Sequence, residues 1–165
     1  MDAVGVDTYL INSEDRAAQP AAVRTATLAV GELPEWLGQT FARVTGYLKA
    51  HSSYPDGPPF ARYFKRADGR FEVAAGFPVR TPVEGDGDVQ GVTLPGGSTA
   101  TTMHVGSYDD MEPGYRAITD WIDTQNAEPI GDPWEVYFSD PGTQPNPAHW
   151  RTQIVQPYRI TGPTR

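Results

Sequence analysis

The sequence of 165 residues contains no cysteine and only three histidines. The lack of cysteine excludes a disulfide framework, a thiolate nucleophile and any cysteine-ligated metal site. No apolar run approaches the roughly 20 residues that a membrane-spanning helix needs. Basic residues are also few, with 13 Lys and Arg against 21 Asp and Glu and a formal charge of −8. This balance argues against nucleic acid or an anionic membrane as the main partner and is compatible with a cationic ligand.

Signals for secretion and for cofactors are missing as well. The start, MDAVGVDTYLIN, has no basic segment followed by an apolar one, so a cytoplasmic location is expected. The histidines at 51, 104 and 149 lie in separate segments without ligand spacing, which predicts no metal site and a structural role for His104. The glycines of residues 85–91 miss the spacing of a dinucleotide-binding loop, and residues 84–88 are expected to be a solvated loop. We therefore expect no cofactor.

The sequence contains an internal repeat with an offset of 74 residues. Between residues 25–64 and 99–138, nine of 40 ungapped positions are identical, where chance gives about two or three. The identities include Thr-Ala-Thr at 25 and 99 and Tyr-Phe at 63 and 137. A single domain, residues 1–165, built from two related halves is the simplest interpretation.

Similar apolar residues in the two copies follow a helical spacing. The pairs are Leu37 and Met111, Phe41 and Tyr115, Val44 and Ile118, Tyr47 and Trp121, and Leu48 and Ile122. Their steps of 4, 3, 3 and 1 predict one amphipathic helix in each copy, at about 34–50 and 112–125. Pro34 and Pro113 suit the first turn of a helix, which does not use their missing N–H groups. Tyr47 and Trp121 are then core residues and not ligand contacts.

Strands are expected on both sides of each helix. Alternation, aromatic content and flanking turns predict them at 25–30, 60–64 and 71–78, and again at 99–105, 134–138 and 150–157. The fold class that follows is α+β: duplicated β-α-β-β units with pseudo-twofold symmetry, two main helices, and antiparallel sheet halves around a ligand cleft.

The boundaries of the two repeats follow from the same pattern. Repeat 1 is expected at about 25–80 and repeat 2 at about 96–160. Residues of about 81–95, rich in glycine and acidic side chains, are expected to be a linking loop. Residues 1–24 show no clear period and are expected to be a loose or edge extension.

The repeats differ most sharply in their aromatic strands, where Ala61 corresponds to Glu135. If Trp134 and Val136 lie under the helix, Glu135 and Tyr137 point from the other face into the cleft, and Tyr63 does so in the first copy. A desolvated carboxylate costs several kcal/mol unless something pairs with it. A bound organic cation, with tyrosine rings as cation–π partners, would satisfy it. A solvent-exposed Glu135, or one paired with an arginine, is the alternative.

Several spaced motifs resemble the GyrI-like small-molecule-binding domain, the effector-binding module of multidrug-responsive regulators. They are Pro95-Gly96-Gly97-Ser98-Thr99-Ala100, His104-Val105-Gly106-Ser107-Tyr108, Trp121, Gly131-Asp132-Pro133-Trp134-Glu135-Val136-Tyr137, Asp140-Pro141, Arg151-Thr152-Gln153-Ile154 and Pro157. The resemblance covers residues 95–157, and the repeat extends it to about 25. One departure is Gln153, where the family's last strand often carries Glu. The regulator's partner domain is not seen, so the chain looks like a stand-alone form.

This resemblance implies a drug-binding cleft in which Glu135 contacts lipophilic cations among aromatic rings. The expected ligand-binding residues are Glu135, Tyr137, Tyr63, Trp150, Tyr108 and Trp36. The partners would be lipophilic aromatic or cationic small molecules, with drug sequestration and resistance as the biological effect. Some stand-alone relatives resemble hydrolases of reactive cyclopropane-bearing natural products, in which Glu135 would act as general acid or base with Tyr63 or Tyr137. A protein-binding inhibitor module is a third hypothesis.

Overall fold

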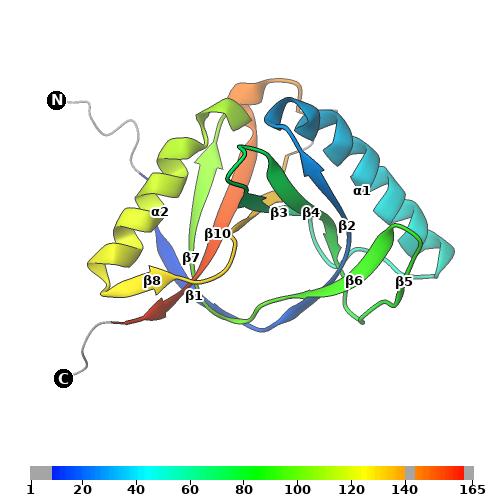
Figure 1. Ribbon diagram of the computed structural model, residues 1–165, viewed down its shortest axis with the longest axis horizontal. Coiled ribbons are helices and arrows are strands. Elements are labelled where there is room, and N and C mark those ends of the chain that lie inside the picture. The colour runs from blue at the N-terminus through cyan, green and yellow to red at the C-terminus, as the bar shows by residue number, and fades with distance from the viewer. Residues whose placement is uncertain (1–8, 140–143, 162–165) are drawn as a thin grey trace. The chain divides into compact units, whose positions relative to one another are not determined.

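The computed structural model describes residues 9–139 and 144–161, which form two α-helices and ten strands (Figure 1). The chain divides into two compact units. The first unit comprises Met1–Arg16, Gly97–Gly131 and Tyr137–Arg165, and the second comprises Ala17–Gly96 and Asp132–Val136. Neither helix of the described residues is long and apolar enough to cross a membrane. The fold is α+β, as the sequence predicts.

The second unit contains one helix and an antiparallel run of strands. In chain order the elements are β2 (Gln19–Leu28), α1 (Leu33–Ala50), β3 (Phe60–Lys65), β4 (Phe71–Pro78), β5 (Gly85–Asp86) and β6 (Val89–Leu94). Residues 134–136 of β9 (Trp134–Tyr137) also belong to it. The pairing runs β9-β3-β4-β2-β6-β5, and each pair is antiparallel.

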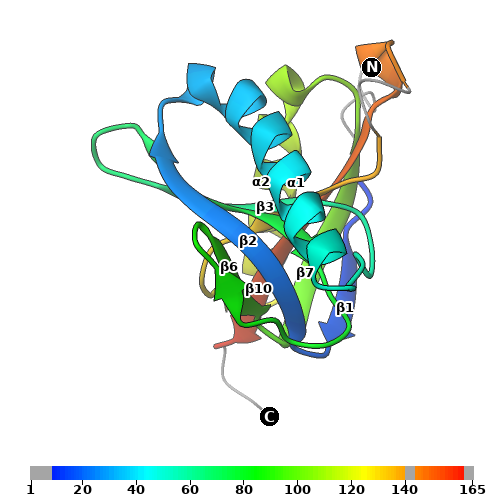
Figure 2. The ribbon, with the colours of Figure 1, turned by 90° about the vertical axis from the view of Figure 1, so that its right-hand side faces the viewer.

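Helix α1 supplies the core of this unit by laying its apolar stripe on β2 and β4. Figure 2 shows the helix running alongside β2. The buried cluster consists of Ala22, Val44, Tyr47, Leu48, Val79 and Val89, with Phe77 and Val83 packed against it. Tyr47 is a core residue, as its place in the helical stripe predicts. Its hydroxyl also accepts a hydrogen bond from the Gly85 N–H at 3.1 Å, which ties the β5–β6 hairpin to the helix.

The first unit has its own sheet and its own helix. Its elements are β1 (Asn12–Arg16), β7 (Gly97–Val105), α2 (Glu112–Thr124), β8 (Ala127–Pro129) and β10 (Arg151–Ile160), and the pairing runs β1-β7-β10-β8. Figure 1 shows α2 alongside β7 and β10. The core cluster contains Ala100, Met111, Ile118, Ile122, Ile154 and Tyr158. Trp121 packs against this cluster, so its predicted core role is confirmed.

The two helices begin and end in the same way. Each carries a proline in its first turn, Pro34 in α1 and Pro113 in α2, as expected. Each is followed by a residue with positive φ, Ser52 at 57° and Asn126 at 55°. A left-handed residue after the last turn redirects the chain and lets it leave the helix. Both predicted helices are confirmed within one residue at each end.

Three sequence-based expectations need correction or completion. The prediction that residues of about 81–95 form a linking loop is wrong, because residues 89–94 form β6 and pair with β2. The strand expected to begin at residue 25 is β2, which begins at Gln19, within the expected amino-terminal extension. Residues 12–16 of that extension form the edge strand β1. Asp140-Pro141 and residues 1–8 lie outside the described part of the chain. The β-α-β-β order occurs in the first half, whereas the second half has the additional strand β8 between α2 and β9. The duplication and the pseudo-twofold symmetry stay predictions.

Two glycine substitutions test the packing of the second unit. A Cβ atom on Gly76 would lie 1.8 Å from the Ala22 carbonyl oxygen, whereas one on Gly46, in the middle of α1, would meet nothing within 4 Å. We expect Gly76→Ala to lower the free energy of unfolding by about 3 kcal/mol. Gly46→Ala should raise it by about 0.5–1 kcal/mol, because alanine loses less backbone entropy in a helix. Urea denaturation measures both, and equal effects would contradict the described register of β2 and β4.

Candidate functional site

Glu135 lies in a row of residues that runs across four strands of the second unit. It is the register partner of Ala61 on β3, which pairs with Ala75 on β4, which pairs with Arg24 on β2. Directly opposed residues of antiparallel strands share one face of the sheet. The row Arg24–Ala75–Ala61–Glu135 therefore lies on a single face. Neighbouring strands are about 4.8 Å apart, so Arg24 and Glu135 are about 14 Å apart along the row.

Helix α1 packs on this same face of the sheet. Arg24 donates from Nη1 to the Thr40 hydroxyl of α1 at 3.1 Å. Phe77, two residues from Ala75 on β4, meets Phe41 of α1 with ring centroids 5.8 Å apart. Glu135 therefore lies on the face where α1 packs, and Trp134 and Val136 lie on the other face of this sheet. The expectation that Trp134 and Val136 face the helix of their own repeat stays a prediction. The register of β3 with β4 decides which face each side chain takes. Because Ala61 is opposed to Ala75, Ala61 and its partner Glu135 lie on the face of Ala75 and Phe77.

The middle of the row is lined by small side chains. Ala61 and Ala75 are fully buried, and Glu135 is half-buried at the end of the row. Tyr63 is two residues from Ala61 on β3 and so shares the face of Glu135. Its ring is half-buried and meets Phe71 edge-on at 6.0 Å. A carboxylate, a phenol ring and two methyl groups thus line one face of this sheet.

The other end of the row is a charge cluster that the sequence analysis missed. The Arg24 guanidinium donates from Nε to the Asp88 carboxylate at 3.0 Å, and Arg43 of α1 reaches the other oxygen of that carboxylate at 2.9 Å. The same guanidinium lies 5.5 Å from the centre of the Trp36 ring. Asp88 lies in the exposed turn between β5 and β6, as the expected solvated loop predicts, and it also joins two arginines in an ion-pair cluster. Trp36 is held by Arg24, about three strands from Glu135.

Three of the predicted ligand-binding residues form an aromatic cluster in the first unit. Tyr108 stacks on Trp150 with ring centroids 4.8 Å apart and an interplanar angle of 32°. It also meets Tyr137 edge-on at 5.8 Å and 70°. Tyr137 is nearly buried, at 9% exposure, whereas Tyr108 keeps 40% of its surface exposed. The cluster presents the ring of Tyr108 to solvent on a base of two further rings.

Trp150 is anchored on two sides. Its indole N–H donates to the Gln144 carbonyl oxygen at 2.7 Å, and its own carbonyl oxygen accepts from the Gly106 N–H at 2.8 Å. The second bond joins the start of β10 to the turn after β7. Both aromatic partners of Tyr108 are thus fixed, one by burial and one by hydrogen bonds.

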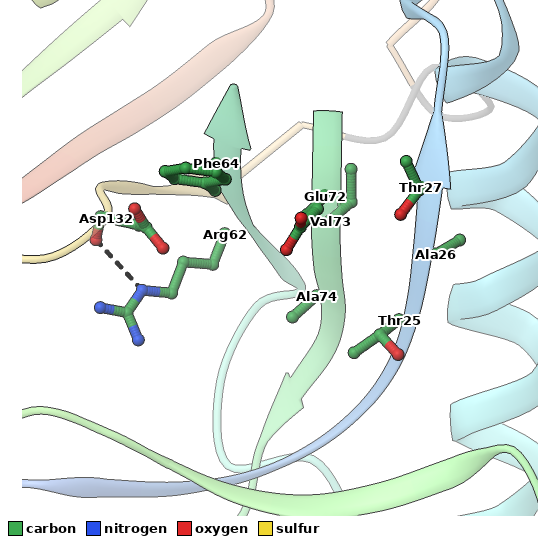
Figure 3. A pocket seen from close by; sticks show the side chains of 9 residues that line it. All are labelled: Thr25, Ala26, Thr27, Arg62, Phe64, Glu72, Val73, Ala74 and Asp132. Atoms are coloured by element: carbon green, nitrogen blue, oxygen red, sulfur yellow. Dashed lines mark hydrogen bonds between the residues drawn. The ribbon is translucent and has the colours of Figure 1, made fainter. Parts of the chain in front are cut away.

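A shallow groove of about 360 Å³ lies on the opposite face of the second unit (Figure 3). Its walls come from β2, β3 and β4, and the side chains drawn include Thr25, Thr27, Arg62, Phe64 and Glu72. The charges of this groove are compensated locally. Arg62 donates from Nε to the Asp132 carbonyl oxygen at 3.1 Å, and Glu72 pairs with Arg66 at 3.4 Å. None of the predicted ligand-binding residues lines it.

The described residues contain no group of three or more side chains that could hold a metal ion. The residues predicted for ligand binding separate into two sets. Glu135, Tyr63 and Trp36 belong to the second unit, and Tyr108, Tyr137 and Trp150 belong to the first. Only the second set forms a single cluster of touching rings. The arginine that holds Trp36 could have been sought in the sequence, since Arg24 interrupts an apolar strand.

Several solved structures have a similar fold at low sequence identity. The DNA-bound EcmrR chain superimposes with a TM-score of 0.77 and 16% identity, over 96% of this chain and 60% of that one. The present chain therefore spans about three fifths of EcmrR. The C-terminal domain of EcmrR gives a TM-score of 0.70 and 15% identity, over 93% of this chain and 99% of that domain. The search of curated protein sequences gave no significant match.

Two further structures differ in what their names record. A hydrolase from Listeria innocua gives a TM-score of 0.65 and 13% identity, over 90% of this chain and 91% of that one. SAV2435, in a complex with tetraphenylphosphonium, gives a TM-score of 0.57 and 10% identity, over 92% of this chain and 94% of that one. At these identities the likeness concerns the fold alone. The sequence profile of the GyrI-like small molecule binding domain matches residues 14–159. That match covers most of the sequence, and the chain belongs to the GyrI-like small-molecule-binding domain family.

Proposed function

We propose that this protein binds bulky aromatic compounds that are cationic or lipophilic, with Glu135 supplying the negative charge. The observation that carries the proposal is the half-buried Glu135 on β9, directly opposed to Ala61 of β3 and in line with two fully buried alanines. Removing a carboxylate from water is costly, and an organic cation offsets that cost without needing directional hydrogen bonds.

The aromatic residues support the same class of ligand. Tyr63 shares the face of Glu135, and Tyr137 belongs to the same strand as Glu135, β9. Tyr108 offers a partly exposed ring that Trp150 and Tyr137 hold in place. Flat rings stack on aromatic ligands and attract cations through their π faces. Trp36, covered by the Arg24 guanidinium, is the most remote of the proposed contacts.

The relatives point in the same direction. The family is one of small-molecule-binding domains, and SAV2435 has been captured with a lipophilic aromatic cation. A protein of this kind can lower the free concentration of a toxic compound in the cytoplasm by sequestering it. Binding through flat apolar surfaces would make the site tolerant of many ligands.

Hydrolysis of a strained, reactive natural product is the second candidate function. The placement of the Glu135 carboxylate and the Tyr63 phenol on one face of the sheet favours it, because a carboxylic acid and a phenol can share the proton transfers of ring opening. One of the similar folds is named a hydrolase. In this case Glu135 would act as general acid or base, and product would exceed the amount of protein.

Replacing Glu135 by Gln tests the proposal, because the amide keeps the shape and removes the charge. With tetraphenylphosphonium as the probe, we expect the wild type to saturate at low micromolar concentration, about −8 kcal/mol, and Glu135→Gln to bind about tenfold more weakly. Isothermal titration calorimetry measures both. Glu72→Gln is the matched control, since Glu72 lies on the opposite face of the same sheet and should leave binding unchanged.

Equal binding by wild type and Glu135→Gln would refute the role of Glu135. In that case capture of a protein partner by the acidic surface becomes the next hypothesis. The hydrolase candidate is tested separately by incubating the protein with a cyclopropane-bearing electrophile and measuring opened product. Multiple turnovers in the wild type and none in Glu135→Gln would establish an enzyme, whereas unchanged ligand at saturation would leave sequestration.

A further inference from the structure

His104 is a buried residue of β7 with hydrogen bonds at both ring nitrogens. The residue is 3% exposed. Its Nδ1 lies 2.9 Å from the Tyr9 hydroxyl, and its Nε2 lies 2.8 Å from the Ser107 carbonyl oxygen. The rings of Tyr9 and His104 are stacked at 6.2 Å. A histidine held from both sides in the interior cannot rotate without breaking a bond.

These contacts determine which nitrogen carries the proton. A carbonyl oxygen only accepts, so Nε2 must donate to Ser107. In the neutral ring Nδ1 is then the acceptor, and the Tyr9 hydroxyl donates to it. The Ser107 carbonyl thus selects the Nε2–H tautomer, and the Tyr9 hydroxyl, which can donate or accept, complements it.

The Ser107 carbonyl connects His104 to the aromatic cluster. Ser107 precedes Tyr108, and Gly106 precedes Ser107 with φ at 136°, a conformation that suits glycine. The Gly106 N–H donates to the Trp150 carbonyl oxygen, and the Ser107 carbonyl oxygen accepts from His104. The backbone of the two residues before Tyr108 is therefore fixed from two sides. That geometry sets the direction in which the Tyr108 ring leaves the chain.

We propose that His104 is a positioning residue for the ligand-binding aromatic cluster: its Nε2–H holds the Ser107 carbonyl and so keeps Tyr108 stacked on Trp150. The inference rests on the proposed function insofar as it assigns that cluster to the ligand. It assigns no contact between His104 and the ligand. The role differs from a generic core role, since it depends on one hydrogen bond at one nitrogen.

The amino-terminal segment takes part in the same arrangement. The Tyr9 ring packs beside Gly114 near the start of α2, where an added Cβ would lie 3.3 Å from it. The Thr102 hydroxyl donates to the Leu10 carbonyl oxygen at 2.9 Å. Tyr9 is thereby kept where its hydroxyl meets Nδ1. The docked segment thus supplies the second hydrogen bond that fixes the orientation of the His104 ring.

Replacing His104 by asparagine or by glutamine tests its two hydrogen bonds separately. Asn can offer an acceptor to Tyr9 but cannot reach Ser107, whereas Gln can place an amide N–H where Nε2 lies. We expect His104→Asn to shift the indole ¹H–¹⁵N resonance of Trp150, which Trp150→Phe assigns. His104→Gln should leave it near its wild-type position. The resonances of Trp36, Trp121 and Trp134 should move in neither variant.

Ligand affinity gives the second readout. With tetraphenylphosphonium, we expect binding about fivefold weaker in His104→Asn and within about twofold of wild type in His104→Gln. Thr152→Val is the matched control. Thr152 is the register partner of His104, and its buried hydroxyl has no hydrogen-bond partner in the described part of the chain. Its loss should leave both the resonance and the affinity unchanged.

The outcomes distinguish this inference from the proposed function. Equal Trp150 shifts in His104→Asn and His104→Gln, or no shift in either, overturn the positioning role whether or not any ligand binds. A wild-type ring without a proton at Nε2, seen in the ¹⁵N spectrum of His104, overturns it without any variant and so covers the case in which His104→Asn does not fold. Absence of tetraphenylphosphonium binding in the wild type, with the expected Trp150 shifts, would instead refute the proposed function alone.

Discussion

Antiparallel register is the constraint on which the rest of this structure depends. Because the strands of the second unit pair without a shift across β2, β4, β3 and β9, one row of side chains joins Arg24 to Glu135. A shift of one residue in any of these pairs would move Glu135 away from the face on which α1 packs and bring Trp134 to that face. The face on which α1 packs, the burial of the two alanines and the environment of the carboxylate all follow from this register.

The two charged ends of the row have different surroundings. Arg24 is surrounded by protein groups, with the Asp88 carboxylate, the Thr40 hydroxyl and the Trp36 ring within contact distance. Such a cluster is a structural solution, since each group of the guanidinium has a defined partner. Glu135 lies beside a fully buried methyl group on β3.

The helices and most strands could be predicted from the sequence more easily than the face of the sheet on which each side chain lies. The helices could be predicted because Leu37, Val44 and Leu48 and their counterparts repeat a helical spacing, and a buried stripe leaves a strong periodic signal. The strand β6 was missed because its neighbours Gly85 to Asp88 have the composition of a loop, while its pairing with β2 is a long-range event. Which face of β9 meets α1 depended on register across three strand pairs, and local alternation carries no information about that. His104 was rightly expected to be structural, but its link to Tyr108 runs through a backbone carbonyl, which no side-chain pattern reveals.

The division of the chain also bears on how the protein folds. The chain passes between the two units after Arg16, Gly96, Gly131 and Val136, so neither unit is one continuous segment. Asn12 of β1 pairs with Thr101 of β7. The pairing of β1 with β7 therefore closes a long loop of the intervening chain. Closing such long loops costs chain entropy before any contact compensates, which favours slow, concerted folding over stepwise assembly. No single truncation therefore isolates either unit, and only a rearranged chain order could do so.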